Sequence, residues 1–218
     1  KVTLLPATLS YEQGAMIEPL AVAVHAVRRF GDIAGKKVAI LGAGPIGNLV
    51  SQVARSMGAK QVLITDVSDY RLTLAKDCGA DYAINTRNRD FNDVLVECFG
   101  RDKADVIYDC AGNNITINQA IHAARKGSSI ILVAVFADMA QVDLAVLNDH
   151  ELDLNTTMMY RHEDYKTAIS LVGTGAIHLE LLMSKVFPFF QYQEAYEFID
   201  ANQETCMKVL IDIHNKTK

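Results

Sequence analysis

The 218-residue sequence predicts an α/β fold built on a doubly wound parallel sheet. Apolar runs rich in β-branched residues alternate with segments of helical period through the middle of the chain. A glycine pattern, Gly42-Ala43-Gly44-Pro45-Ile46-Gly47, joins the first of these runs to the helical segment after it. Half of the residues are hydrophobic and 22% are charged, a balance typical of globular chains. Together these observations favour parallel strands joined by right-handed helical crossovers.

The stretch before the glycines, Ser10 to Arg29, has helical character. Ser10 is suited to cap the first turn, with Gln13 as its capping-box partner three residues later. Pro19 interrupts this stretch, and proline in a helix interior costs about 3 kcal/mol. We therefore expect either a kink or two successive helices that meet at Pro19.

The alternation then predicts six strands and the helices between them. Gly58 and Gly79 are placed to end the first two of these helices, and Ser68 to cap the second. The run 129–136 has the apolar composition of a strand covered on both faces. The expected strands are 37–41, 61–65, 82–84, 105–109, 129–136 and 152–160, and the expected helices are 46–57, 68–78, 91–99, 117–124 and 165–172.

The end of the chain follows another pattern. Residues 185–188 and 207–213 are expected to form two strands flanking a helix at 193–202, with Pro188 at a strand end or edge. These strands have no place in a six-stranded sheet. We expect them, and the first residues, to be remnants of a second, catalytic domain. The predicted organisation is the end of a catalytic domain and a linking helix at 1–29, a nucleotide-binding domain at 30–160, and a return to the catalytic domain at 161–218.

Each glycine in the pattern has a physical role. Gly42 permits a tight turn, Gly44 lets a pyrophosphate approach the backbone, and Gly47 lets the helix pack closely. The helix N-terminus offers free N–H groups to the phosphates. Asp66, which ends the next strand about 20 residues later, could accept both ribose hydroxyls and repel a 2′-phosphate, favouring NAD over NADP. Its alternative role is an ordinary strand-end aspartate. Arg71 either covers the adenine or ribose or is a solvated surface arginine.

Composition excludes several classes of protein. The formal net charge is −5 and no basic run occurs, so we expect no nucleic-acid partner. No apolar run approaches the roughly 20 residues that cross a bilayer, and no signal peptide is recognisable, so we expect no membrane association. The four cysteines lie apart, without metal-ligand spacing, and are expected to be buried free thiols in a reducing compartment, which favours the cytoplasm.

Two further polar features stand out. Glu18 lies in an otherwise apolar run, where a metal ion or water would offset the cost of burying it; a solvated or capping glutamate is an equal alternative. The cluster 160–164 either caps a helix, through His162 or Asp164, or forms a loop facing the cofactor. His25 is expected to be a structural helix residue. No residue is singled out as catalytic.

Taken together, these stretches resemble the zinc-dependent medium-chain dehydrogenases, most closely their polyol (sorbitol) dehydrogenase branch. The resemblance rests on motifs spread over nearly the whole chain: Ala15-Met16-Ile17-Glu18-Pro19-Leu20 with His25-Ala26, Val38 to Gly47, Asp66 to Leu72, Asp109-Cys110-Ala111-Gly112 and Met207-Lys208-Val209-Leu210-Ile211. It implies a Rossmann nucleotide-binding domain, NAD and zinc as cofactors, and a homodimer or homotetramer. It also implies an upstream catalytic domain that supplies most of the zinc site.

Site residues follow from the resemblance by position. Glu18 corresponds to the late acidic residue of the zinc site. Met159-Tyr160-Arg161 falls where the polyol branch often has Phe-Arg-Tyr, so the aromatic and basic residues have exchanged places. The implied cofactor-binding residues are Gly42, Gly44, Pro45, Ile46, Gly47, Asp66, Arg71, Ala111, Gly112, Val133, Ala134, Val135, Tyr160 and Arg161.

The leading expectation is an NAD-dependent oxidoreductase that transfers hydride between a small polyol or secondary alcohol and the nicotinamide in the intact enzyme. A threonine- or alcohol-dehydrogenase-like substrate is the alternative within this class. A different class is an isolated NAD-binding module without turnover, and a third is a redox-ratio sensor. The resemblance implies that this chain alone is an inactive fragment with the zinc site mostly outside it.

Overall fold

The computed structural model describes residues 2–214 and has at its centre a six-stranded parallel sheet. The strand order is β3-β2-β1-β4-β5-β6, and every neighbouring pair is parallel. This is the predicted doubly wound order, with its crevice at the carboxyl ends of β1 and β4. The strands are β1 Lys37–Leu41, β2 Gln61–Asp66, β3 Tyr82–Asn85, β4 Val106–Asp109, β5 Ser129–Leu132 and β6 Asp153–Thr156.

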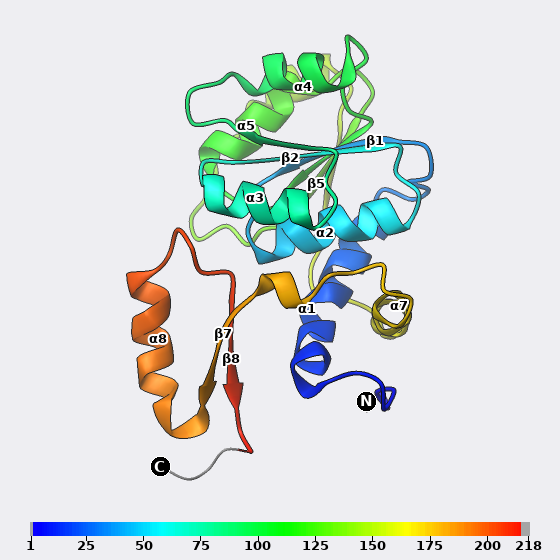
Figure 1. The fold of residues 1–218 in the computed structure, drawn as a ribbon. Coiled ribbons are helices and arrows are strands. Elements are labelled where there is room, and N and C mark those ends of the chain that lie inside the picture. Colours follow the sequence, from blue (N-terminus) through cyan, green and yellow to red (C-terminus); the bar gives the residue numbers. More distant parts are fainter. Residues whose placement is uncertain (1, 215–218) are drawn as a thin grey trace.

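Helices cover both faces of the sheet and bury two hydrophobic cores. One core lies under α1, α2, α3 and α7, and the other under α4 and α5 (Figure 1). The capping box of Ser10 with Gln13 and the Ser68 cap form as predicted, and Gly58 and Gly79 have φ of +92°. The helices are α1 Tyr11–Arg28, α2 Pro45–Ser56, α3 Asp69–Asp77, α4 Phe91–Phe99, α5 Asn114–Ala123, α6 Leu144–Asp149, α7 His162–Gly173 and α8 Tyr192–Ala201.

Pro19 does not divide its helix, so of the two alternatives, a kink or two successive helices, the second is wrong. The structure has one helix, α1, that continues through Pro19 for 18 residues. Proline removes the N–H that would bond to the carbonyl of Ala15. Because Ala15 is exposed whereas Pro19 is buried, water can satisfy that carbonyl. The helix therefore tolerates the proline on a face where its ring adds apolar packing.

Two predicted strands are too long. The run 129–136 forms a strand only to Leu132, and 152–160 only from Asp153 to Thr156. After Leu132 the N–H groups of Val133 and Ala134 both donate to the carbonyl of Asp109, at 2.9 and 3.0 Å, which bends the chain off the sheet. The two edge strands of the sheet are β3 and β6, so the run 129–136 does not lie at an edge.

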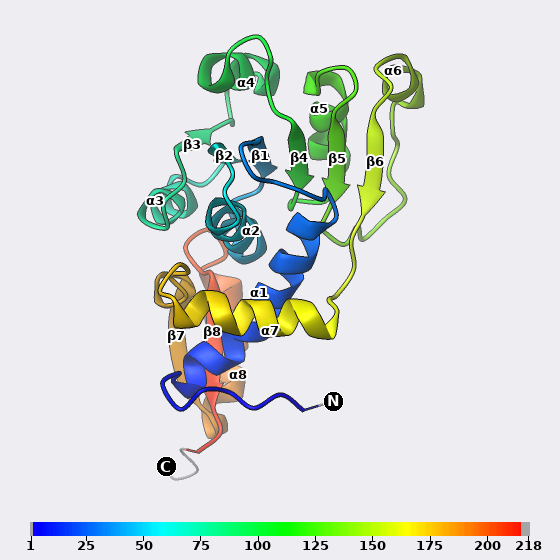
Figure 2. The same cartoon turned by 90° about the vertical axis from the view of Figure 1, so that its right-hand side faces the viewer.

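The end of the chain forms its own two-stranded sheet with a helix between the strands, as the sequence predicts. Strands β7 (Met183–Pro188) and β8 (Lys208–Asp212) pair in parallel, with α8 between them in sequence and short 3₁₀ turns at Glu180–Leu182 and Phe189–Gln191. Both views place this unit outside the six-stranded sheet, beside the first half of α1 (Figures 1 and 2). The proposed domain boundaries stay predictions.

The four cysteines are free thiols, as expected. Cys78 and Cys206 are buried, whereas Cys98 and Cys110 are only half-buried. Burial raises the pKa of Cys78 to about 11, so its thiol is neutral at physiological pH. Within residues 2–214, no helix is long and apolar enough to cross a membrane.

A buried carboxylate joins α1 to α7, which lie across each other (Figure 2). Asp164 accepts hydrogen bonds from the N–H of Arg161 at 2.8 Å and from Arg28 Nη1 at 2.7 Å, and its Oδ2 lies 2.8 Å from His25 Nδ1. Burial alone would raise the pKa of Asp164. The hydrogen bonds from Arg161, Arg28 and His25 outweigh burial and hold the pKa below its usual value. His25 therefore has the structural role expected of it. The N-cap residue of α7 is Arg161 rather than His162 or Asp164, and Asp164 lies in the first turn of the helix.

We expect Asp164→Ala to lower the free energy of unfolding by about 2–4 kcal/mol at neutral pH, because it removes the buried acceptor shared by Arg28, His25 and the N–H of Arg161. Urea unfolding measures the loss. Since the folded pKa is lowered, the stabilisation is present above about pH 4 and disappears as the pH falls through the folded value. The control is Asp149→Ala, whose pair with Lys126 is largely exposed and is expected to contribute much less to the free energy of unfolding. Equal losses in both variants would contradict this assignment.

Candidate dinucleotide site

The glycine turn lies between β1 and α2, and the structure accounts for each of its glycines. Gly42 has φ of +97°, which allows the tight turn off β1. A Cβ on Gly47 would lie 1.8 Å from the carbonyl oxygen of Gly42, so α2 begins in direct contact with the end of β1. A Cβ on Gly44 would meet nothing within 4 Å. The turn is therefore closed on its inner side and open at Gly44.

Asn48 fixes the orientation of the open peptide. Its side chain has no exposed surface and donates from Nδ2 to the carbonyl of Ala43 at 2.6 Å. In a planar trans peptide the C=O and the next N–H point in opposite directions. Holding the Ala43 carbonyl inward thus turns the Gly44 N–H outward. Gly44 is also the N-cap of α2, where first-turn N–H groups lack helical partners and the helix dipole favours an anion.

Asp66 lies at the carboxyl end of β2 and is held by the backbone. Its Oδ2 accepts from the N–H of Ala43 at 2.7 Å, and its Oδ1 accepts from Val67 and Ser68 at 2.8 and 2.9 Å. The carboxylate therefore joins the glycine turn to the end of β2. It remains half-buried, so part of it faces outward.

A second turn closes the other side of the crevice, after β4. The buried carboxylate of Asp109 accepts from the N–H groups of Ala111 and Gly112 at 3.0 and 3.1 Å. Burial raises its pKa, and these hydrogen bonds partly offset that effect. A Cβ on Gly112 would lie 2.5 Å from that of Ala134, so this turn contacts the segment after β5.

A cavity of about 560 Å³ lies between the two turns. It has the size of a small-molecule site and lies at the predicted switch point of the sheet. Five predicted cofactor residues line it: Gly42, Gly44, Asp66, Arg71 and Ala111. The remaining lining residues are Leu41, Thr65, Val67, Thr86, Arg87, Cys110, Asn113, Ile115, Thr116 and Gln119.

The fold and the glycine turn agree with a comparison of the sequence with known families. The model of the zinc-binding dehydrogenase family matches residues 45–174, more than half of the chain. The chain belongs to the zinc-binding dehydrogenase family. Sorbitol dehydrogenase 1 from Saccharomyces cerevisiae is 33% identical over 213 residues, which are 95% of this chain and 60% of that protein. The chain thus spans about 60% of the length of this curated zinc-binding dehydrogenase relative.

Solved structures add the cofactors of two similar proteins. A short chain alcohol dehydrogenase from Escherichia coli CFT073, complexed with NADH, is 25% identical with a TM-score of 0.89, over 97% of this chain and 62% of that one. A zinc-binding dehydrogenase from Sinorhizobium meliloti 1021, bound to NADP, is 26% identical with a TM-score of 0.83, over 95% of this chain and 61% of that one. Since proteins of this fold hold either cofactor, the choice between them depends on local residues.

No metal-binding cluster surrounds the predicted zinc residue, Glu18, within residues 2–214. Glu18 is an exposed residue on α1. Among residues 2–214, no three His, Cys, Asp or Glu side chains are grouped so that they could hold a metal ion. Catalytic zinc sites usually need three protein ligands. The side chains of residues 2–214 therefore do not fit a catalytic zinc by themselves.

The structure does not bring the remaining predicted residues to the cavity wall. Tyr160 packs against Tyr165, with ring centroids 5.7 Å apart, and borders a separate pocket with Thr3 and His162. Arg161 is exposed at the N-cap of α7. The start of α2 behind Gly44 is formed by Pro45, Ile46 and Gly47. The segment that follows β5 contains Val133, Ala134 and Val135. Contacts of these six residues with a cofactor stay predictions.

Sequence reasoning missed Asp109 and Arg87 as site residues. Asp109 ends β4 and orders the turn after it. Arg87 comes two residues after the end of β3 and reaches the cavity from there. In a parallel sheet, the residues that follow neighbouring strands meet at one edge. That rule, applied to the third and fourth strands as well as to the first two, would have found both residues.

Proposed function

We propose that this chain binds NAD(H) in the cavity between the turn after β1 and the turn after β4. The observation that carries the proposal is the position of Asp66. Three backbone N–H groups hold its carboxylate beside the open Gly44 peptide, so one wall of the cavity combines an anion site with a hydroxyl acceptor. A dinucleotide has this pairing of groups, a pyrophosphate next to a ribose diol.

In this proposal, different residues bind different parts of the cofactor. The N–H groups at Gly44 and in the first turn of α2 bind the pyrophosphate. The outward part of the Asp66 carboxylate accepts hydrogen bonds from the adenosine ribose. Its negative charge repels a 2′-phosphate, which favours NAD over NADP. Burial raises the pKa of Cys110 in the cavity wall, so its thiol is neutral and takes no nucleophilic part.

We infer further that the protein is an oxidoreductase acting on a polyol or another secondary alcohol. Family membership and the sorbitol dehydrogenase relative support this inference. When bound, NAD supplies the hydride acceptor. The chain contributes the fixed position of the cofactor through the glycine turn, and the turn after β4 is itself held by the contact of Gly112 with Ala134.

Asp66→Asn tests the cofactor choice, because asparagine keeps the shape of the side chain and removes its charge. We expect NADH affinity to fall about tenfold to a hundredfold, since charge-assisted hydrogen bonds contribute roughly 1.5–3 kcal/mol. We also expect the preference for NADH over NADPH to narrow. Calorimetric titration of both cofactors measures the two effects.

Asp77→Asn is the matched control. Asp77 is exposed at the end of α3 and does not line the cavity. We expect it to keep wild-type affinity for both cofactors. An unchanged cofactor preference in Asp66→Asn would remove Asp66 from the site, and a wild-type chain that binds neither cofactor would overturn the proposed function.

A further inference from the structure

Arg87 reaches the cofactor cavity from a strand that the dinucleotide motif does not include. It follows β3, which lies beside β2 at the edge of the sheet. The N–H of Thr86 donates to the backbone carbonyl of Asp66 at 3.0 Å, so the segment after β3 is fastened to the end of β2. Thr86 and Arg87 form part of the cavity wall next to Asp66.

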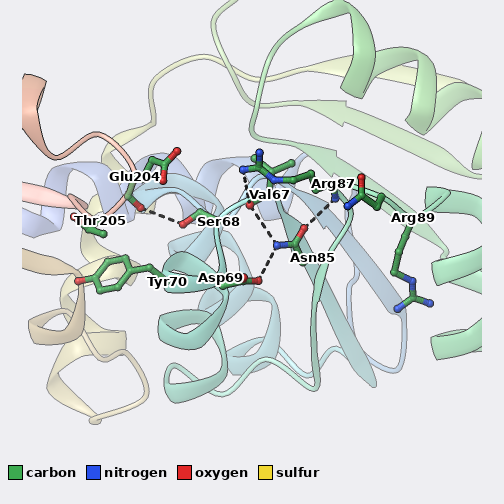
Figure 3. Close-up of a pocket in the computed structure, with 10 residues that line it drawn as sticks. Val67, Ser68, Asp69, Tyr70, Asn85, Arg87, Arg89, Glu204 and Thr205 are labelled. Carbon is green, nitrogen blue, oxygen red and sulfur yellow. Dashed lines mark hydrogen bonds between the residues drawn. The ribbon is translucent and has the colours of Figure 1, made fainter.

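One hydrogen bond holds the Arg87 guanidinium and a second holds its backbone (Figure 3). Its Nη2 donates to the carbonyl of Val67 at 3.2 Å, and its backbone N–H donates to Oδ1 of Asn85 at 2.9 Å. Nδ2 of Asn85 in turn donates to Asp69 at 2.7 Å and to the Val67 carbonyl at 3.3 Å. Arg87 is thus connected to the segment after β2 both directly and through Asn85.

The charge of Arg87 has no carboxylate partner among the ion pairs of residues 2–214. Arg89, two residues further on, differs in this respect because it pairs with Glu97. Both arginines border an outer pocket of about 670 Å³, but only Arg87 also borders the cofactor cavity. Arg87 and Val67 are shared by the two spaces and so form the partition between them.

The partition has the chemistry of a surface for a flat base. The Val67 side chain is 51% exposed and offers an apolar face. The guanidinium of arginine is planar, is weakly hydrated and stacks on aromatic rings. With the ribose on Asp66 and the pyrophosphate at Gly44, the base continues from the ribose on the side away from the phosphates. That side is the one bordered by the residues that follow β2 and β3.

The geometry points to Arg87 as a base-recognition residue, whose guanidinium packs on the adenine of the dinucleotide while Val67 contacts the base from the end of β2. This inference rests on the proposed function, since it assigns a role within the proposed NAD site. It adds a residue that follows β3 to a site otherwise built from residues at the ends of β1, β2 and β4.

Three variants test it by calorimetric titration with NADH, NADPH and AMP. We expect Arg87→Ala to weaken NADH binding roughly three- to tenfold, the range for an exposed to partly buried cation–π contact. AMP and NADPH are expected to lose affinity by the same factor, because all three share the base. Arg87→Lys is expected to recover little of the lost affinity, because lysine keeps the charge but lacks the planar face.

Arg89→Ala is the matched control, and its NADH affinity is expected to stay within about twofold of wild type. Since Arg87 is exposed, all three variants should keep the wild-type melting temperature.

Four other outcomes would overturn the assignment, and each would point to a different reason. Wild-type affinity in Arg87→Ala would show that the guanidinium does not contact the ligand. Full recovery by Arg87→Lys would show that charge alone matters, as for a phosphate contact. A larger loss for NADPH than for NADH would place Arg87 at the 2′-phosphate instead. Absence of NADH binding in the wild-type chain would overturn the proposed site itself, and this inference with it.

Discussion

Gly44→Val is expected to abolish NADH binding in a chain that stays folded. A Cβ at this position meets nothing within 4 Å, and the backbone of Gly44 is extended, with φ −65° and ψ −176°, so valine fits without strain. Its methyl groups would project into the space where the pyrophosphate approaches the start of α2. The loss of a favourable N-cap residue is expected to cost only about 1 kcal/mol.

Calorimetry with NADH and thermal unfolding test this variant together. The matched control is Gly173→Val at the end of α7, where a Cβ also meets nothing within 4 Å, far from the cavity wall. We expect this control to bind NADH as the wild type does. A folded Gly44→Val chain with wild-type affinity would show that the pyrophosphate does not lie at the glycine turn.

Gly47→Ala is expected to have the largest effect on folding. The added Cβ would lie 1.8 Å from the oxygen and 3.0 Å from the carbonyl carbon of Gly42, and both are backbone atoms of the turn. To relieve this clash, α2 must move away from β1 or the turn must open. Overpacking of this kind lowers the free energy of unfolding by about 3 kcal/mol or more. Urea unfolding measures the loss, with Gly44→Ala as the control for an added methyl group in open space. Equal stability of the two variants would show that α2 does not depend on the close contact with Gly42.

The features that the sequence predicts well are those set by neighbouring residues. The Ser10 and Ser68 caps, the left-handed glycines at the ends of α2 and α3, and the turn at Gly42 each depend on a few adjacent positions. The parallel order of the sheet follows from the alternation of strands and helices. The family resemblance rests on the same local motifs, and the family match confirms it.

The features that the sequence misplaces depend on contacts between distant residues. The apolar run after Ser129 gives no sign of where the strand ends, because the carbonyl of Asp109 captures the two N–H groups that follow Leu132. Tyr160 does not line the cavity and packs against Tyr165, a contact between residues on different segments; its contact with a cofactor stays a prediction. Arg87 was missed because only the pairing of β3 with β2 brings it beside Asp66.

A crystal structure of this chain with NADH would show whether the cavity between the turns after β1 and β4 binds the cofactor. We expect the pyrophosphate at the Gly44 N–H and the first turn of α2, and the adenosine ribose on Asp66. Density for the cofactor at any other place on the chain, with the Gly44 peptide and Asp66 free of it, would show that this cavity is not the cofactor site.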